Sequence, residues 1–296
     1  MKALVTGANG QLGGELGRTA TDAVACTGLG RAQLDIADAQ AVRAALEELQ
    51  PDVVINAAAY TAVDAAEADR DAAWRTNAEG AGVLAACCAG SGARLLHLST
   101  DFVFAGDAST PYAPAAAAGP LGEYGRSKLA GEQAVLHALP RAFILRTGWV
   151  YAAGGNNFVN TMLRLMAERD ELSVVADQVG TPTWARGLAA ACWAAAARPQ
   201  LHGIYHWSDA GVCSWYDFAV AILEEGGALG LVRDDVAVRP VSSAEYPTAA
   251  RRPAYSVLDK SSAWRDLQLP AVHWRRQLRA MLNEVKETRQ ADESRK

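Results

Sequence analysis

Residues 2–13 read KALVTGANGQLG, and this stretch decides the fold that the sequence predicts. Lys2–Thr6 is a short apolar strand, and glycines follow at positions 7, 10 and 13 before a helix expected over about 12–20. Glycines at these positions let the backbone turn tightly, approach a pyrophosphate and pack the helix on the sheet. The N–H groups at the helix start can bind phosphate. A loop without a ligand is the alternative, but the position directly after the first strand favours a dinucleotide site.

The rest of the chain alternates strands with helices. Apolar strand segments are expected at 23–27, 52–56, 94–98 and 143–146, with helical segments at 39–49, 65–88 and 124–140 between them. This order is typical of a doubly wound parallel α/β sheet. We therefore predict a Rossmann-type NAD(P)-binding domain over 1–150, to which 174–198 returns, and a smaller C-terminal α/β substrate lobe over 151–285, partly interleaved with it. The charged tail over 286–296 is expected to fray.

The end of the second strand bears on the choice of cofactor. An acid that binds the ribose is expected there when the cofactor is NAD. Gly30 and Arg31 stand there instead. Arg31 can pair with a 2′-phosphate, which favours NADPH and leaves NADH possible. A solvated loop arginine is the alternative for this residue.

Small and polar residues follow the next two strands. Ala57–Thr61 comes after the third strand, and Ser99-Thr100-Asp101 comes at the end of the fourth. Ligands bind at the carboxyl ends of strands in open α/β sheets, and alanines there leave room for a cofactor. The helical segment between these two strands contains a further candidate, Asn77.

Tyr124 and Lys128 are four residues apart at the start of an apolar helical segment, so they project from one helix face. We expect the lysine ammonium to lower the pKa of the phenol from ~10 toward neutrality. The tyrosine could then donate or accept a proton. An exposed helical pair is the alternative, and the glycine turn and strand-end hydroxyls upstream favour catalysis.

Composition excludes several classes of protein. The chain has 296 residues and a net charge of -5. We therefore expect no basic face and no binding to nucleic acid. No apolar run reaches the ~18–20 residues that span a bilayer, and the chain starts directly with a strand, so we expect neither membrane insertion nor a signal peptide. Five cysteines without a CxxC pair fit the reducing cytoplasm and no cysteine metal site.

Seven motifs in order resemble one family of enzymes. They are TGANGQLG (6–13), NAAAYTAVD (56–64), STDFVF (99–104), YGRSKLAGE (124–132), RTGWVY (146–151), DQVGTPT (177–183) and SAEYPTAARRP (243–253). Together they are similar to the dTDP-4-dehydrorhamnose reductases, which are extended short-chain dehydrogenases/reductases, over about residues 1–285. The resemblance implies NAD(P)H-dependent reduction of the C4 ketone of dTDP-4-dehydro-β-L-rhamnose, giving dTDP-L-rhamnose.

The resemblance also implies roles for single residues. Tyr124 would donate a proton to the carbonyl oxygen, Lys128 would hold the nicotinamide ribose and lower the tyrosine pKa, and Thr100 would hydrogen-bond the oxygen. The candidate cofactor-binding residues are Gly7, Gly10, Gln11 and Leu12 at the pyrophosphate, Asp35 and Ile36 at the adenine, and Arg31, Ala58, Ala59, Tyr60, Thr61, Asn77, Tyr124 and Lys128 elsewhere. The candidates for binding the sugar nucleotide are Thr100, Asp101, Tyr124 and Trp149.

One departure from the family concerns a metal ion. In relatives that dimerise through magnesium, three glutamates bind the ion. Glu15 and Glu284 match two of them, but Arg186 occupies the third position. We therefore predict no metal site and a monomer or weak homodimer.

Three alternatives to this activity remain open. The substrate can be another dTDP-4-keto-6-deoxy sugar, as in antibiotic deoxysugar or streptose pathways. A non-catalytic regulatory subunit of this fold would tend to lose part of the catalytic triad, whereas Thr100, Tyr124 and Lys128 are all present. An epimerase would normally have an acid at the end of the second strand.

Overall fold

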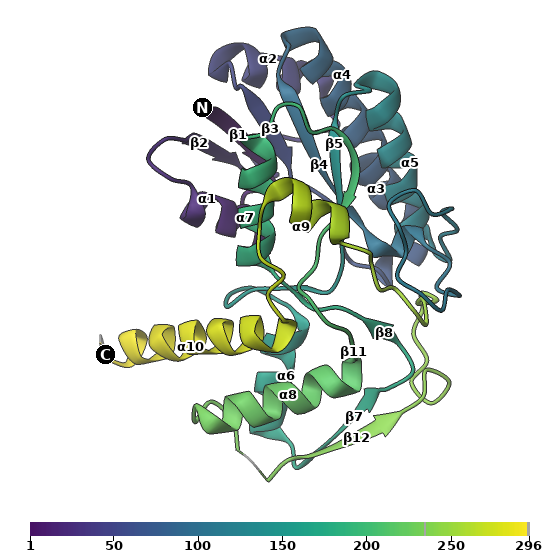
Figure 1. The fold of residues 1–296 in the computed structure, drawn as a ribbon, viewed down its shortest axis with the longest axis vertical. Helices are drawn as coiled ribbons and strands as arrows, with labels where there is room; N and C mark the ends of the chain where they lie inside the picture. The colour runs from purple at the N-terminus through teal and green to yellow at the C-terminus, as the bar shows by residue number, and fades with distance from the viewer. Residues whose placement is uncertain (234, 295–296) are drawn as a thin grey trace.

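The main domain is built on one parallel sheet. The computed structural model describes residues 1–233 and 235–294, and Figure 1 shows its fold. Six strands pair in the order β10-β5-β4-β3-β1-β2, and each of these pairings is parallel. The strands are β1 (Lys2–Thr6), β2 (Ala25–Leu29), β3 (Val53–Asn56), β4 (Arg94–Thr100), β5 (Phe143–Thr147) and β10 (Gly203–His206).

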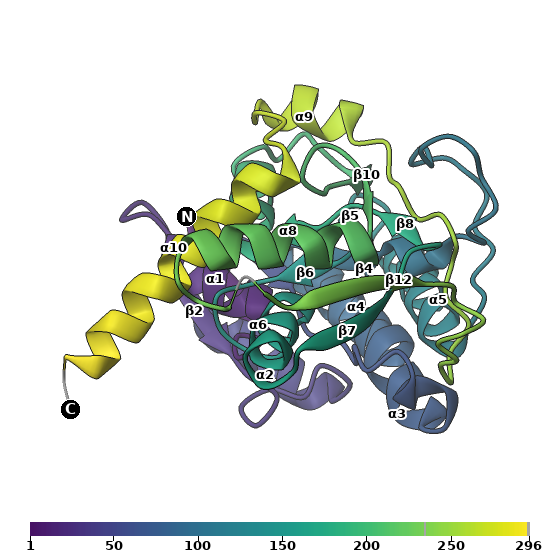
Figure 2. The same ribbon diagram turned by 90° about the horizontal axis from the view of Figure 1, so that it is seen from below.

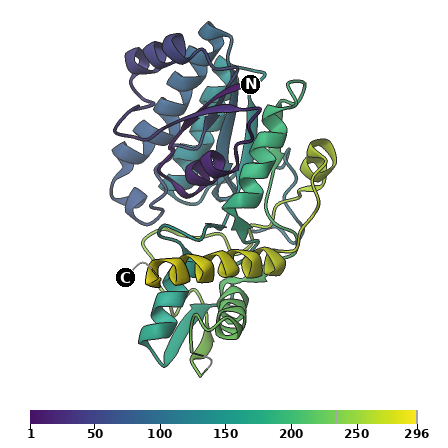
Figure 3. The ribbon, with the colours of Figure 1, turned by 90° about the vertical axis from the view of Figure 1, so that its left-hand side faces the viewer.

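Helices cover both faces of this sheet, as Figure 3 shows. One face packs against α1 (Gln11–Thr19), α7 (Ala185–Ala196) and α9 (Ser261–Leu267). The other packs against α2 (Ala39–Leu49), α4 (Ala81–Ser91) and α5 (Glu123–Ala138). Val5 and Ile55 point into the first core, and their strand neighbours Leu4 and Val54 point into the second. The predicted doubly wound parallel sheet is confirmed.

The sixth strand corrects the sequence-based assignment. The sequence pattern places 203–206 in the smaller lobe, whereas β10 extends the main sheet by pairing with β5. The Tyr205 ring stacks on Phe143 with centroids 4.7 Å apart. The sequence favours the lobe because, after residue 197, the strand–helix pattern loosens into short pieces with many aromatic residues.

The expected helix over 65–88 is broken into four pieces. They are the 3₁₀ turn η1 (Ala65–Glu67), α3 (Arg70–Trp74), the π-helical segment η2 (Arg75–Gly80) and α4. A Cβ on Gly131 of α5 would lie 2.0 Å from the Asn77 carbonyl oxygen, so α5 packs directly on the widened turn. π-Helical turns of this kind often occur at functional sites.

The smaller lobe lies below the sheet in Figure 1 and is seen from below in Figure 2. It contains α6 (Phe158–Glu168), α8 (Trp215–Ala228), α10 (Trp274–Glu293) and the parallel pair β7 (Glu171–Val175) and β12 (Ala237–Val241). Two short pairs complete it: β6 (Val150–Tyr151) with β9 (Thr183–Trp184), and β8 (Val179–Gly180) with β11 (Cys213–Ser214). Phe218, Leu163 and Met281 are buried together in its core.

Helix α10 is anchored just before the charged tail over 286–296, which the sequence predicts to fray. Helix α10 continues to Glu293. Leu278, Met281, Leu282 and Val285 recur at helical spacing and are buried in the core of the lobe. This apolar stripe anchors the helix, and its charged residues occupy the remaining faces.

Candidate active site

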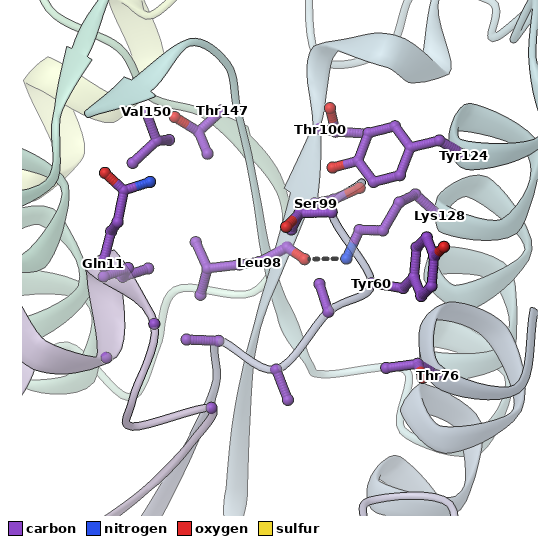
Figure 4. Close-up of a pocket in the computed structure, with 18 of the residues that line it drawn as sticks. Gln11, Tyr60, Thr76, Leu98, Ser99, Thr100, Tyr124, Lys128, Thr147 and Val150 are labelled. Carbon is purple, nitrogen blue, oxygen red and sulfur yellow. Dashed lines mark hydrogen bonds between the residues drawn. The ribbon is translucent and has the colours of Figure 1, made fainter. Parts of the chain in front are cut away.

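One large cavity lies between the carboxyl ends of the sheet strands and the smaller lobe. Its volume is about 1120 Å³. Figure 4 shows part of its wall, with Gln11 on one side and Tyr124 and Lys128 on the other. Nearly all the predicted site residues line it: Gly7, Gly10, Gln11, Leu12, Arg31, Asp35, Ile36, Ala58, Ala59, Tyr60, Thr61, Thr100, Asp101, Tyr124, Lys128 and Trp149. This volume is slightly above the range of about 300–1,000 Å³ that is usual for ligand pockets.

The glycine turn forms one wall because no side chain fits there. Gly7 has φ +69°, and a Cβ on it would lie 2.6 Å from the Ala58 amide nitrogen. A Cβ on Gly13 would lie 2.2 Å from the Gly7 carbonyl oxygen, so α1 begins directly on the turn. The result is a backbone cradle that ends at a helix N-terminus, which suits a pyrophosphate.

The far end of the cavity carries the charges expected for an adenosine phosphate. Arg31 is exposed on this wall. Gly30 carries no acidic side chain, and a Cβ there would lie 2.5 Å from Nδ2 of Asn9, so a larger residue would require the Asn9 side chain to move. Asp35 accepts a hydrogen bond from Arg75 at 2.6 Å. The Asp35 charge is therefore largely neutralised by Arg75, and Arg31 remains available to an anionic ligand.

Thr100, Tyr124 and Lys128 meet in the middle of the cavity. Thr100 ends β4, and the other two residues lie one turn apart on α5. Figure 4 shows the Tyr124 ring directed toward Thr100. Lys128 is 2% exposed, and its Nζ donates a hydrogen bond to the Leu98 carbonyl at 2.6 Å. This bond fixes the ammonium on the cavity floor.

The pKa of Tyr124 moves in the direction opposite to the prediction. Burial raises the pKa of Tyr124 to about 12, with a smaller increase from the Asp101 charge, and a hydrogen bond with Thr100 only partly offsets this. Burial also lowers the pKa of Lys128 to about 8. The lysine is engaged by Leu98 and is only partly charged near pH 8, so it does not bring the phenol toward neutrality in the free protein. The phenol stays protonated, which suits a proton donor.

Asp101 sits next to this group in a closely fitted pocket. It is 2% exposed, and its Oδ1 accepts a hydrogen bond from Thr100 at 3.1 Å. A Cβ on Gly148 would lie 2.5 Å from the carboxylate, so only glycine fits there. Burial raises the pKa of Asp101 to about 6, and hydrogen bonds from Ser256 and Thr100 oppose the rise. This carboxylate can accept a hydrogen bond from a sugar hydroxyl.

Trp149 forms the wall on the side of the lobe. Its φ of 51° is unusual for a residue other than glycine, and such strain is concentrated at functional sites. The indole stacks on Trp215 with centroids 3.5 Å apart and an interplanar angle of 5°. A Cβ on Gly180 would lie 2.6 Å from the Trp149 ring. The strained backbone therefore presents a flat aromatic surface at the cavity.

Comparisons with known proteins identify the family. The sequence matches the family described as RmlD substrate binding domain over residues 1–287. A dTDP-4-dehydrorhamnose reductase from Streptomyces griseus is 47% identical over 279 residues, which cover 92% of this chain and 90% of that protein. The chain belongs to the dTDP-4-dehydrorhamnose reductase family.

Two further relatives of the family are informative. A probable dTDP-4,6-dihydroxy-2-methyloxan-3-one 4-ketoreductase from Streptomyces antibioticus is 45% identical over 293 residues, 96% of each chain. The crystal structure of the dTDP-4-dehydrorhamnose reductase from Bacillus anthracis in complex with NADP superposes with a TM-score of 0.90. It is 38% identical, and the match covers 96% of this chain and 99% of that one. The resemblance found in the motifs is confirmed.

Asn77 is the one candidate that the cavity does not include. Its side chain is 1% exposed; its Oδ1 accepts a hydrogen bond from the Tyr60 backbone N–H at 2.9 Å, and its Nδ2 donates to the Tyr60 carbonyl at 3.1 Å. It also donates to Ser127 Oγ at 3.1 Å. Asn77 thus lies behind the described cavity wall and positions the Tyr60 loop against α5.

Other wall residues were not named from the sequence. They include Thr76, Asn157, Trp215 and Arg252. Asn157 is the N-cap of α6, and its amide donates to Gln11 Oε1 at 2.9 Å, linking the lobe to the glycine turn. Arg252 lies within one of the family motifs, so position in a motif could have indicated it. Trp215 lies in the stretch 203–218, which the sequence places around the pocket, whereas nothing local marks Thr76 as a wall residue.

The residues at the position where the resemblance implies a magnesium site do not fit the ion. Arg186 Nη2 lies 2.7 Å from Glu284 and its Nε lies 3.5 Å from Glu15. Arg18 pairs with the same two carboxylates. Among the described residues, no cluster of three or more acidic, histidine or cysteine side chains could hold a metal. The two guanidinium groups occupy the place that a dication would need.

We therefore expect activity and assembly to be independent of magnesium. The carboxylates are already paired with arginines, so chelation removes no ligand that the protein uses. The measurement is sedimentation velocity and turnover in EDTA and then in excess magnesium. An oligomer that dissociates in EDTA and re-forms with magnesium would show that Arg186 does not exclude the ion.

Proposed function

We propose that this protein is an NADPH-dependent reductase that converts the C4 ketone of dTDP-4-dehydro-β-L-rhamnose to the alcohol of dTDP-L-rhamnose. The observation that carries the proposal is the meeting of Thr100, Tyr124 and Lys128 inside a cavity that begins at the glycine turn. Family membership over nearly the whole chain supports the same reaction. No helix in the described part of the chain is long and apolar enough to cross a membrane.

The glycine turn, the wall residues Ala58–Thr61 and Lys128 fit a dinucleotide. When bound, the reduced nicotinamide supplies the hydride that reaches C4 of the sugar. Lys128 holds the ribose next to it, and Thr100 hydrogen-bonds the carbonyl oxygen. Tyr124 gives its phenolic proton to that oxygen as negative charge develops, so the ketone gains one hydride and one proton. The tyrosine then recovers a proton from solvent.

Asp101 and Trp149 are proposed to hold the sugar. The carboxylate accepts from a ring hydroxyl, and the indole packs on the apolar side of the deoxysugar. Five free thiols fit the reducing cytoplasm as the proposed place of action. The proposed assembly is a monomer or weak homodimer.

The experiment is incubation of the protein with NADPH and the dTDP-4-keto sugar. We expect loss of reduced-nicotinamide absorbance in proportion to dTDP-L-rhamnose formed, with the product identified by chromatography and NMR. Absence of NADPH oxidation with this and related keto sugars would contradict the proposal and favour a regulatory subunit.

A second candidate substrate is a different dTDP-4-keto-6-deoxy sugar. The observation that favours it is the 45% identity to the Streptomyces antibioticus ketoreductase, which is similar to that of the Streptomyces griseus relative. The kcat/KM values for a panel of dTDP-4-keto sugars decide between them. The best substrate has the highest value, because discrimination depends on transition-state binding.

Replacing Arg31 by alanine should raise the KM for NADPH by roughly ten-fold and leave the KM for NADH nearly unchanged. The guanidinium has a 2′-phosphate to pair with only in NADPH, and Gly30 offers no acid to repel that phosphate. Steady-state kinetics with both cofactors measures the difference, with NADH as the internal control. Equal increases for the two cofactors would show that Arg31 does not contact the phosphate.

A further inference from the structure

The backbone of Trp149 is fixed by hydrogen bonds that do not reach its indole ring. Trp149 has a φ of 51°, in the left-handed region that residues other than glycine seldom adopt. Its carbonyl accepts a hydrogen bond from the Thr183 amide at 3.1 Å, and the Gly148 carbonyl accepts one from the Thr183 hydroxyl at 2.6 Å. The position of the ring on the cavity wall therefore depends on the side chains that pack against it.

Trp215 stacks on this indole with almost complete overlap. The ring centroids are 3.5 Å apart and the interplanar angle is 5°. Carbon atoms in contact are separated by about 3.5–4.0 Å, so the two rings lie nearly directly above one another. Aromatic pairs more often have centroids about 4.5–7 Å apart. The Trp149 ring cannot turn about its side-chain bonds without losing this contact.

The Trp215 side chain is anchored in the lobe. Trp215 starts α8, whose first turn is closed by a capping box: the Ser214 amide donates to Asp217 at 2.9 Å, and the Asp217 amide donates to Ser214 Oγ at 3.0 Å. The Phe158 ring packs on Trp215 with centroids 4.7 Å apart, and it stacks in turn on the buried Phe218 at 5.5 Å. Trp215 is therefore fixed independently of Trp149 and can hold that ring in place.

The stack connects the two parts of the chain at the cavity. Trp149 follows β5 of the main sheet, whereas Trp215 belongs to the lobe. Both residues line the cavity that contains Thr100 and Tyr124. The lobe therefore determines where the aromatic wall lies relative to the residues proposed to act on the ketone.

We infer that Trp215 is a positioning residue that holds the Trp149 indole in place for the sugar, an inference that rests on the proposed function. Trp215 acts through Trp149 and not on the reacting atoms. A ring that is fixed before the sugar binds loses less conformational entropy on binding than a ring that turns freely. Loss of Trp215 therefore weakens binding of the sugar and leaves the dinucleotide site and the proton donor unaffected.

The test measures the steady-state kinetics of W215L with NADPH and the dTDP-4-keto sugar. Leucine keeps an apolar side chain at this position and removes the flat ring. We expect the KM for the keto sugar to rise about five- to ten-fold, the factor that an aromatic pair contributes beyond its buried area. The KM for NADPH and kcat should change by less than about two-fold, because the lost interaction is equal in ground state and transition state. W215F, which restores a ring, should recover part of the loss.

The matched control is W193L. Trp193 is also half-buried, but it lies outside the cavity wall, where its Nε1 donates to Thr19 at 3.2 Å. We expect W193L to leave the KM for the keto sugar unchanged, and thermal unfolding of both variants checks the fold. If W215L lowers the unfolding temperature but leaves this KM unchanged, then Trp215 has only a structural role and the inference is overturned.

A double-mutant cycle tests whether Trp215 acts through Trp149. W149L alone should raise the KM for the keto sugar at least as much as W215L does. The double variant should then resemble W149L, because a supporting residue has no effect once the ring that it supports is gone. Increases that multiply would show that Trp215 acts independently, which overturns the inference, while wild-type turnover leaves the proposed function intact. A wild-type protein that oxidises no NADPH with dTDP-4-keto sugars overturns both.

Discussion

Replacing Tyr124 by phenylalanine should lower kcat by roughly 10²–10⁴-fold while the fold and NADPH binding persist. Only the hydroxyl is lost, and the ring keeps its edge-to-face contact with Phe102, whose centroid is 5.7 Å away. The phenol, with its pKa raised to about 12, is protonated at neutral pH and is the acid that the carbonyl oxygen meets. Single-turnover kinetics with saturating NADPH measures the loss.

The matched control for this substitution is Tyr205→Phe. The Tyr205 hydroxyl contacts Asp266 at 3.3 Å and lies outside the cavity wall, so its removal should leave kcat within two-fold or so. Circular dichroism and NADPH titration of both variants check folding. Near-normal turnover by a folded Tyr124→Phe protein would remove Tyr124 from the mechanism.

Replacing Lys128 by methionine should lower kcat/KM by about 10²–10³-fold, because the group that holds the ribose and its charge are both lost. The loss should not come from unfolding. The folded pKa of about 8 is below the 10.5 of the free side chain, so between these values the unfolded chain binds more protons and stability rises with pH. Below pH 8 the buried ammonium lowers the free energy of unfolding, and replacement by methionine removes this destabilisation.

The same lysine should set a limb in the pH profile. In the wild-type protein kcat/KM for NADPH should fall as the pH rises through about 8, because Lys128 loses its proton there, and Lys128→Met should lack this limb. Lys260 is the matched control, since it is buried outside the cavity wall and its pKa is also lowered to about 8 by burial. A limb that persists in Lys128→Met and disappears in Lys260→Met would contradict the assignment.

The parts of the fold that could be predicted are those encoded locally. The first βα unit was identifiable because it is encoded in neighbouring residues: an apolar strand at Lys2–Thr6, followed by glycines that permit a tight turn into a helix. The π-helical segment Arg75–Gly80 was not, because it is set by the close packing of Gly131 against Asn77 from a distant helix. Strand β10 was assigned to the smaller lobe instead of the main sheet, because only its pairing with β5 decides its place.

The features of the candidate site also divide into those that the local sequence predicts and those that depend on distant contacts. Positions at or just after strand ends, such as Thr100 and Ala58, were predictable since parallel strands bring their carboxyl ends to one edge. The pKa direction of Tyr124 was not, because sequence spacing shows the nearby lysine but neither the burial of the phenol nor the Leu98 carbonyl that engages the ammonium. The stacking of Trp215 on Trp149 was not predictable either, because it joins residues that are far apart in the sequence.

The most direct test of the proposed reaction traces the hydride. The protein is incubated with NADPH that carries deuterium at the transferable nicotinamide position, together with dTDP-4-dehydro-β-L-rhamnose, and the product is examined by NMR. We expect one deuterium at C4 of the sugar for each NADPH oxidised, and a parallel loss of both in Tyr124→Phe. A product with hydrogen from solvent at C4, or an altered sugar formed without net NADPH oxidation, would contradict reduction by hydride transfer.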